Sequence, residues 1–429
     1  MGSTGTGGIS RRDMLHGATL APFALSAAPA LSTAPSLSSP MVQAAKPGFT
    51  PAALRAQLLL APDIRYFNAA NIGPSFRKVA DVQARGNAAF QDNPSREFRE
   101  RYPLIADRLR ARLAARIGAR AEEIALVRNA SEANSVAVLG LDLKRGDRVV
   151  LTAHNHQSTL DTWRLRARRE GLELVVLPVP VEATSPQQIV DAFAAAITPG
   201  TRAVFLSHIT NVTGLAYPIA DIAALARKAG AWLHVDGAQT FGWLRLDMTA
   251  LGVDSYSAST HKWLLGPLEG GVLYVKRDRQ AELNPLMLSH GYWLTDPKNL
   301  ETAQKYEILG QRDDPKLEAI ETALDMMDGI GETMIEGGVR HVARTMRTAL
   351  SRVPGARIVG AAHPDLSGPV ITVAFPGKDV TAMRARLWSS AKIATAQNEA
   401  DGQPLIRFSP HLYNSEDEIA LVADLLTRG

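Results

Sequence analysis

From about residue 120, short apolar runs alternate with segments of helical periodicity, and this alternation constrains the fold more than any other feature. Strand–helix alternation is typical of a mostly parallel sheet with helices on both faces. Such a sheet binds ligands beyond the carboxyl ends of its strands, so the residues that follow each strand are the first candidates for a site. The expected strands lie at 123–127, 147–153, 172–179, 201–209, 231–236, 255–259 and 270–277.

The pattern changes after about residue 315, where a long helical stretch leads to an expected strand at 368–375 and a last one at 405–410. This pattern is typical of a smaller α+β domain. We expect a signal and linker over 1–45, a large α/β domain over 46–310 and a small domain over 311–429. The N-terminal segment of the large domain is expected to contribute to the small domain.

The composition excludes several classes of function. The chain of 429 residues has a net charge of +4, an excess too small to indicate a nucleic-acid partner. The Arg-rich stretch 95–120 has Leu104, Leu109, Leu113 and Ile117 at helical spacing and is expected to form a solvated amphipathic helix. There is no cysteine, which excludes disulfides, thiolate metal sites and a cysteine nucleophile. No metal is expected at the site.

The N-terminal 34 residues resemble a twin-arginine export signal. Arg11 and Arg12 precede a mildly apolar stretch and then a run of small residues, and the apolar part is too short to span a membrane. A disordered tail with a chance Arg-Arg pair is the alternative. The ordered succession of charge, apolar run and small residues favours export, so we expect a periplasmic protein that uses the twin-arginine translocation machinery.

Four strand ends carry polar residues, each of which has an ordinary explanation when taken alone. Ser131 is expected to cap a helix whose free N–H groups can bind phosphate, although a plain cap explains it equally well. His156 could stack on a planar ring or simply be a satisfied polar residue. Asp236 ends an apolar strand, where a carboxylate needs a partner such as a protonated ring nitrogen, another cation or a helix N-terminus. Lys262 is either a nucleophile or a solvated loop lysine, but the tight apolar "KWLLGP" argues against solvation.

Together these four residues would form one site for a planar, phosphorylated aldehyde with a cationic ring. The helix start binds the phosphate, His156 stacks on the ring, Asp236 pairs with the ring nitrogen and Lys262 forms an imine. This set of groups indicates pyridoxal 5′-phosphate (PLP). A nicotinamide cofactor is disfavoured because no G-x-G-x-x-G motif follows a strand and opens a helix.

Across about residues 60–415 the chain resembles the class V aminotransferase family of fold-type I PLP enzymes. The resemblance is carried by "HVDGAQ" with "SASTHKWLLGP", and is supported by "RNASEAN", "HNHQS", "SHITNVTGLAYPI" and "IRFSPHLYN". It implies that Lys262 binds PLP covalently, that Asp236 pairs with the ring nitrogen and that Gln239 contacts the phenolic oxygen. The resemblance also implies that Ser131, Glu132, Ser259 and His261 surround the phosphate, the first two mainly through backbone groups. It places Asn211 near the cofactor oxygen and the substrate, and Arg407 as the clamp on a substrate carboxylate.

Within the family the chain looks most similar to the isopenicillin-N-epimerase-like branch, through "YFNAANIGPS", "ILGQRDDPKLEAI" and "SPHLYN". Asn68 in the first of these stretches is expected to contact substrate. In signal type, length and core motifs the chain is also similar to an exported PLP enzyme of pyoverdine maturation. The resemblance implies a homodimer that acts on a small-molecule or peptidic amine by transamination, epimerisation or oxidative decarboxylation. A PLP fold retained as a binding protein without chemistry is the alternative.

Overall fold

The computed structural model describes residues 50–428 except 291, 293, 294 and 401. The expected signal segment, with Arg11 and Arg12, lies outside the described residues. Among the helices that are described, none combines the length and apolar character needed to cross a membrane.

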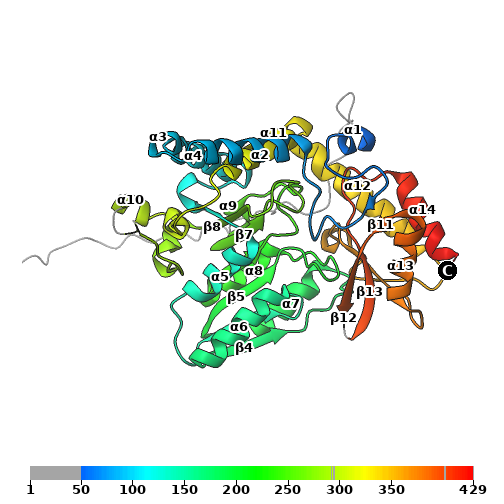
Figure 1. The fold of residues 1–429 in the computed structure, drawn as a ribbon. Coiled ribbons are helices and arrows are strands. Elements are labelled where there is room, and N and C mark those ends of the chain that lie inside the picture. The colour runs from blue at the N-terminus through cyan, green and yellow to red at the C-terminus, as the bar shows by residue number, and fades with distance from the viewer. Residues whose placement is uncertain (1–49, 291, 293–294, 401, 429) are drawn as a thin grey trace, which may run out of the picture. The chain divides into compact units, whose positions relative to one another are not determined.

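The large α/β part is built on a seven-stranded sheet in the order β2-β8-β7-β6-β5-β3-β4 (Figure 1). All neighbouring strands run parallel except β8, which is antiparallel to both β2 and β7. The predicted mostly parallel seven-stranded sheet is therefore confirmed. The strands are β2 (Ile124–Val127), β3 (Arg148–Thr152), β4 (Glu173–Leu177), β5 (Thr201–Ser207), β6 (Trp232–Asp236), β7 (Ser255–Ser259) and β8 (Gly271–Val275).

Helices cover both faces of this sheet because successive strand residues point to opposite sides. In β3, Val149 and Leu151 share one core with α5 (Ala130–Gly140) and α6 (Gln157–Glu170). Val150 lies in the core on the other face with α7 (Pro186–Ala196) and α8 (Ile219–Ala229). The strands other than the edge strand β4 are largely buried on two sides, which explains the apolar runs seen in most of them.

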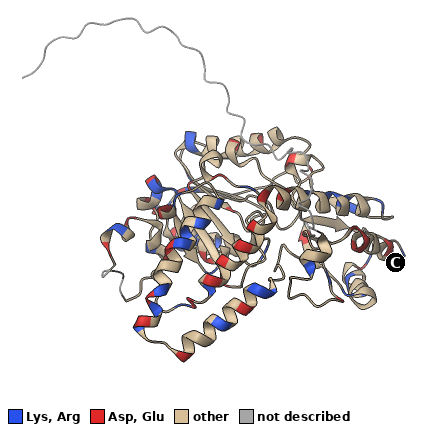
Figure 2. Cartoon of the chain, turned by 90° about the horizontal axis from the view of Figure 1, so that it is seen from above, with Lys and Arg blue, Asp and Glu red and all other residues tan. Residues whose placement is uncertain are grey.

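A layer of long helices, α2 (Arg77–Asp92), α4 (Arg101–Arg116) and α11 (Lys316–Ile330), lies beside the sheet (Figure 1). The arginines of α4 pair with acids of α11, including Arg108 with Glu321 at 2.6 Å, and basic and acidic segments alternate along the described helices in Figure 2. The predicted amphipathic helix over 95–120 is divided into α3 (Arg96–Arg99) and α4.

The predicted apolar face of this helix is wrong at one position. Leu109, Leu113 and Ile117 are buried, but Leu104 is exposed and Ile105 is buried in its place. The reason is helical spacing: a step of five residues rotates a side chain about 140° away, whereas a step of four keeps it on the same face.

The C-terminal part contains a four-stranded antiparallel sheet in the order β12-β13-β10-β9, covered by helices (Figure 1). The long helical stretch after residue 315 is interrupted at Gly331, where φ is +97°, so that α11 and α12 are separate helices. The elements are β9 (Arg357–Val359), β10 (Ile371–Ala374), β12 (Ala396–Ala400), β13 (Gln403–Phe408), α12 (Glu332–Ser351), α13 (Val380–Ala391) and α14 (Glu416–Thr427).

The N-terminal segment of the described chain is joined to this C-terminal part. Strand β1 (Arg65–Tyr66) pairs in parallel with β11 (Ile393–Ala394), and the backbone N–H of Ala69 donates to the carbonyl of Ser409 at 3.1 Å. This pairing brings the 68–75 loop beside β13 and the carboxyl ends of β5, β6 and β7. The remaining α-helices are short: α1 (Pro51–Arg55), α9 (Met248–Leu251) and α10 (Pro297–Leu300).

Candidate active site

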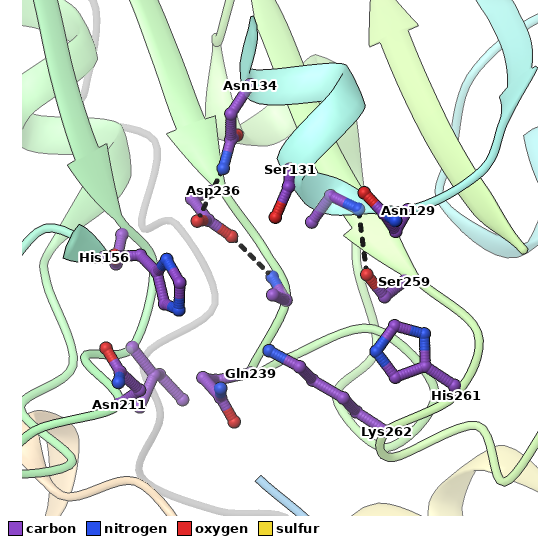
Figure 3. A pocket seen from close by; sticks show the side chains of 14 residues that line it. Asn129, Ser131, Asn134, His156, Asn211, Asp236, Gln239, Ser259, His261 and Lys262 are labelled. Atoms are coloured by element: carbon purple, nitrogen blue, oxygen red, sulfur yellow. Dashed lines mark hydrogen bonds between the residues drawn. The ribbon is translucent and has the colours of Figure 1, made fainter. Parts of the chain in front are cut away.

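A cavity of about 170 Å³ lies where β5, β6 and β7 end and α5 begins (Figure 3). Eight residues predicted from the sequence line it: Ser131, His156, Asn211, Asp236, Gln239, Ser259, His261 and Lys262. The structure therefore gathers the residues after several strands at one edge, as the parallel topology requires. The other lining residues are Asn129, Ala130, Asn134, Ser207, Ile209 and Ala238.

The Lys262 side chain extends into this cavity from a tightly held loop (Figure 3). Burial lowers the pKa of Lys262, and Asp236 opposes this shift while Arg407 adds to it. The neutral amine that burial favours is the nucleophilic form. The loop is held from outside by Gly73, whose N–H donates to the carbonyl of His261 at 2.7 Å. A Cβ at Gly73 would lie 2.0 Å from the Lys262 carbonyl oxygen, so only glycine permits this approach.

The Asp236 carboxylate ends β6 and receives an N–H donor on each oxygen. Asn134 Nδ2 donates to Oδ2 at 2.9 Å, and the Ala238 N–H donates to Oδ1 at 2.9 Å. Asp236 is buried, and a buried carboxylate of this kind requires both donors and a cation. A protonated ring nitrogen would supply that cation.

The start of α5 forms the opposite end of the cavity, and here the predicted cap is wrong. Asn129, not Ser131, is the N-cap residue, and its side-chain oxygen accepts from the Glu132 N–H at 3.0 Å. Ser259 Oγ accepts from the Ala130 N–H at 2.8 Å. The cap moves because α5 begins at Ala130, two residues nearer the strand than a cap at Ser131 would place it. Ser131 instead directs its hydroxyl toward the cavity from the first turn (Figure 3).

This end of the cavity suits an anion. A helix N-terminus carries a partial positive charge. The buried Nδ1 of His261 beside it has no partner in the described chain, which leaves it open to a ligand. Burial lowers the pKa of His261 to about 4, with Lys262 adding to the shift, so the imidazole is neutral and can donate one N–H.

Glu132, which was expected near the phosphate, does not line this cavity. Its carboxylate accepts from the Arg128 N–H at 2.5 Å, and its own N–H is held by Asn129. The side chain therefore stabilises the turn before α5. The contact expected from Glu132 was mainly through its backbone, and it stays a prediction.

His156 and Gln239 are each oriented by hydrogen bonds to neighbouring residues. His156 Nδ1 lies 2.8 Å from Ser158 Oγ at the start of α6, and burial lowers its pKa, so the ring is neutral. Gln239 accepts from Trp263 Nε1 at 2.9 Å and donates to the Ala70 carbonyl at 3.0 Å. One N–H of the Gln239 amide remains for a ligand oxygen.

Arg407 and Asn68 lie together beside the cavity. Arg407 Nη2 donates to Asn68 Oδ1 at 3.0 Å, and Nη1 donates to the Asn211 carbonyl at 3.1 Å. The guanidinium is buried, and its Nε has no partner in the described chain. Burial lowers the pKa of Arg407 to about 10; Tyr66 raises it, and no described carboxylate contributes. A buried cation without a carboxylate is stabilised by a bound anion, which matches the predicted substrate clamp.

The donor set fits PLP. The cavity holds a buried amine for its aldehyde, a carboxylate for its ring nitrogen, a free amide N–H for its phenolic oxygen and a helix N-terminus for its phosphate. The orphaned His261 nitrogen at the helix end is the observation that most directly requires a ligand there.

The fold and this cavity define a fold-type I PLP enzyme. Residues 83–422 match the family model for class V aminotransferases, and the chain belongs to that family. The predictions of the family, the cofactor and an enzymatic activity are confirmed.

Among the most similar curated relatives are two isopenicillin N epimerases. That of Amycolatopsis lactamdurans is 33% identical over 87% of this chain and 96% of its own length. That of Streptomyces clavuligerus is 30% identical, also over 87% of this chain and 96% of its own length. The fold matches a solved mutant of C-DES with glycine covalently linked to its PLP cofactor, at a TM-score of 0.78. That structure is 24% identical, with 87% of this chain and 98% of that chain covered, so it supports the fold alone.

Six lining residues were missed by sequence reasoning: Asn129, Ala130, Asn134, Ser207, Ile209 and Ala238. Asn134 had a usable signal, because it is a buried amide in a helix whose neighbours Ala133, Val136 and Ala137 are apolar. The others adjoin predicted residues and are indistinguishable from ordinary strand ends until the sheet is assembled.

Proposed function

We propose that this protein is an exported PLP enzyme that epimerises the amino-bearing carbon of an amino acid, or of an amino-acid unit in a larger natural product. The observation that carries the proposal is Arg407, a buried guanidinium without a described carboxylate partner, beside the buried amine of Lys262. A carbon that bears both an amine and a carboxylate would place these groups at Lys262 and Arg407.

Each residue of the site has a separate role in the proposed reaction. When bound, PLP supplies a ring that withdraws electrons from the carbon bearing the amine. Asp236 accepts a hydrogen bond from the ring nitrogen and so keeps the proton on that nitrogen. Arg407, together with Asn68, orients the substrate carboxylate. Lys262, with its lowered pKa, accepts the proton from the substrate carbon. Epimerisation returns a proton to the opposite face of that carbon, so it consumes no oxidant and no amino acceptor.

Epimerisation is preferred to the other reactions of this class because the relatives at 33% and 30% identity are epimerases. Transamination remains the second candidate, since Asp236, Lys262 and Arg407 would serve it equally well. Cysteine desulfuration through a protein persulfide is rejected because the chain has no cysteine. A binding protein without chemistry is disfavoured by the buried, reactive Lys262.

The test of the reaction is proton exchange at the substrate carbon in deuterated water. We expect the PLP-loaded protein to exchange that hydrogen in a panel of amino acids and aminoacyl peptides, and to yield both stereoisomers from one. Release of a keto acid, with conversion of the cofactor to its amine form, would show that the reaction is transamination and not epimerisation. A protein that binds PLP without any exchange would support the binding-protein alternative.

We infer export from Arg11 and Arg12 and the segment after them. PLP is made in the cytoplasm, and the twin-arginine route carries folded proteins, so it can deliver the enzyme with its cofactor bound. Changing both arginines to lysine is expected to retain active, PLP-loaded enzyme in the cytoplasm. Fractionation that finds the double variant in the periplasm, or the wild type only in the cytoplasm, would contradict export without affecting the PLP assignment.

An exported enzyme of this kind would act on an exported product, and a siderophore peptide is the substrate we favour. A peptide-synthetase or siderophore gene cluster beside this gene would support that assignment. Activity on free amino acids but on no peptidic amine would contradict it.

We also expect a homodimer. The exposed side chains of Leu286 and Met287 support it, because they line a hollow at the start of α5 that a second copy could cover. Gln311 stands where the family usually has the threonine that reaches the neighbouring subunit's phosphate, and it accepts from Arg99 at 3.3 Å. Light scattering that finds only monomers would contradict the dimer.

A further inference from the structure

A row of polar side chains lies buried behind the cofactor cavity, where a parallel sheet is normally apolar. In β6, His234 and Asp236 point to the face covered by α5, whereas Leu233 and Val235 lie in the core on the other face. The register places His234 opposite Ser255 and Asp236 opposite Ser257. We call His234, Asp236, Ser255 and Ser257 the polar stripe; all four are buried.

Hydrogen bonds join this stripe to α5 and to Asp236 in one continuous chain. Trp232 Nε1 donates to Ser255 Oγ at 2.9 Å, and Ser255 Oγ lies 2.8 Å from His234 Nδ1. His234 Nε2 lies 2.8 Å from Asn134 Oδ1, and Asn134 Nδ2 donates to Asp236 Oδ2 at 2.9 Å.

The direction of every bond follows from the chemistry of the groups. The Asp236 carboxylate can only accept, so Asn134 turns Nδ2 toward it and presents Oδ1 to His234 Nε2. Nδ1 of the neutral His234 ring is then left to accept from the Ser255 hydroxyl, which itself accepts from Trp232 Nε1. His234 then carries its proton on Nε2 and donates to the Asn134 carbonyl, which can only accept. Burial lowers the pKa of His234 to about 4, in agreement with a neutral ring. All the donors therefore point toward Asp236.

The consequence is that the Asn134 amide cannot rotate by half a turn to exchange the positions of its nitrogen and oxygen. Its oxygen receives His234 and also the Ser257 hydroxyl at 2.5 Å, so its nitrogen must face Asp236. The second N–H of Asn134 reaches Thr159 Oγ1 at 3.3 Å, which completes the amide. A fully satisfied buried network of this type has one low-energy arrangement.

We propose that Asn134, His234, Ser255 and Ser257 are positioning residues that keep both oxygens of the Asp236 carboxylate hydrogen-bonded, so that the proton between Asp236 and bound PLP stays on the ring nitrogen. A carboxylate that loses an N–H donor becomes a stronger base and draws that proton to itself. The neutral ring that remains is the poorer electron acceptor. This inference depends on the cofactor and not on the reaction proposed above.

Packing alone does not account for the arrangement. Buried polar side chains without functional need are commonly replaced by apolar ones of the same shape at little cost to stability. Here an amide, an imidazole and two hydroxyls are all buried and all bonded in the direction of one carboxylate. That carboxylate is the group predicted to contact the ring.

The test uses the holoenzyme reconstituted with PLP that carries ¹⁵N in its ring. For Asn134→Leu we expect the ring-nitrogen resonance to move toward that of neutral pyridine, and the dissociation constant of PLP to rise about tenfold or more. The matched control is Thr159→Val, which removes the other contact of the same amide and leaves its bond to Asp236 intact. It should keep the wild-type resonance and affinity.

A second pair of variants tests the direction of the hydrogen bonds that lead to Asp236, and it remains informative if Asn134→Leu does not fold. His234→Phe removes the donor to Asn134 and should shift the resonance part of the way, with a severalfold loss of PLP affinity. His234→Gln retains an N–H close to the position of Nε2 and should restore both. The proposal would be overturned if Asn134→Leu and His234→Phe both keep the wild-type resonance, or if Thr159→Val shifts it equally. It would also be overturned if His234→Gln does not restore the resonance and the PLP affinity that His234→Phe loses.

Discussion

The two sides of the cavity differ in how completely the protein satisfies its own charged groups. On the cofactor side, Asp236 has an N–H donor on each oxygen, and the chain of bonds behind it closes within the protein. On the substrate side, Arg407 is just as buried but has only two neutral acceptors, Asn68 and the Asn211 carbonyl, and its Nε has no described partner.

The difference indicates what each side is built for. A group with its hydrogen bonds already made is preorganised for a ligand that stays, as PLP does. A buried cation without a compensating charge gains most from a ligand that brings an anion and then leaves. We therefore expect changes on the cofactor side to reduce the rate of the chemical step, and changes on the substrate side to weaken binding. The following predictions test that division.

The largest effect is expected for Lys262→Ala, because this residue both binds PLP and acts as the base. Turnover should fall by at least about 10⁴-fold, and the visible band that borohydride abolishes should disappear. Lys305→Ala is a matched control, since Lys305 is also buried with a pKa lowered by burial but bonds the Gln280 carbonyl far along the chain from the site. A colourless wild type that ignores added PLP would contradict the central assignment.

Asp236→Asn should produce the next largest loss of turnover, and it should lower kcat rather than weaken substrate binding. The change is nearly isosteric, so the protein should fold, but the loss of a charge beside the ring should cost about 3 kcal/mol of barrier, roughly a hundredfold in kcat. Steady-state kinetics with a thermal melt as the folding control would measure it. If kcat stays near the wild-type value, Asp236 has a different task.

Arg407→Lys tests the substrate side and should mainly raise KM, by roughly ten- to a hundredfold, since lysine cannot bind a carboxylate with two parallel N–H groups. The PLP spectrum should not change. Arg384→Lys, a partly exposed arginine on α13 that bonds Thr395, is the control for loss of a guanidinium in the same part of the chain. Unchanged kinetics in Arg407→Lys would indicate a substrate amine without a neighbouring carboxylate.

The same side of the cavity should show a pH dependence. The pKa of Arg407 lies at about 10, below its usual value, because burial disfavours the cation. As pH rises through that value the guanidinium loses its proton, so kcat/KM for a carboxylate substrate should fall above pH 10 for the wild type. A methyl-ester substrate should not show this fall. An equal fall for the ester would assign the titration to another group.

The smallest effect on turnover is expected where the two sides meet, at His411. Its ring stacks on Trp263, next to Lys262, and on Tyr413, and its Nε2 lies 3.1 Å from the Trp263 carbonyl. Burial lowers the pKa of His411 to about 4. The unfolded chain therefore binds this proton first, at about pH 6.5, and the free energy of unfolding should decrease as pH falls from 6.5 to 4.

The His411→Gln variant measures that contribution. Its turnover at neutral pH should lie within about threefold of wild type, and its stability should depend less on pH between 6.5 and 4, by an amount of the order of 3 kcal/mol. Urea unfolding at a series of pH values gives the comparison. Parallel pH curves for the two proteins would show that His411 is not protonated on unfolding in this range.

The sequence predicted the sheet well because the strands of the large part, except the edge strand β4, are largely buried on both faces. Burial on two sides requires continuous apolar runs, and such runs are visible without a structure. The strands β9 and β12 were not predicted, since both are short and partly exposed and "AQNEA" has no apolar run. The exposed Leu104 and the break at Gly331 were missed because periodicity predicts that a helix is present better than it predicts its phase or its ends.

The sequence by itself determined the chemistry that the site can perform. Ser131, His156, Asp236 and Lys262 are the residues that PLP requires, and their positions at the ends of expected strands were enough to identify the cofactor. The role expected of Arg407 came from the family resemblance. Only the tertiary structure decided how each group is held. The bond from the start of α5 to Ser259, the orientation of the Asn134 amide and the isolation of Arg407 all depend on atoms from segments far apart in the chain. Hydrogen-bond direction and burial are properties of such assembled neighbours, and no local pattern in the sequence encodes them.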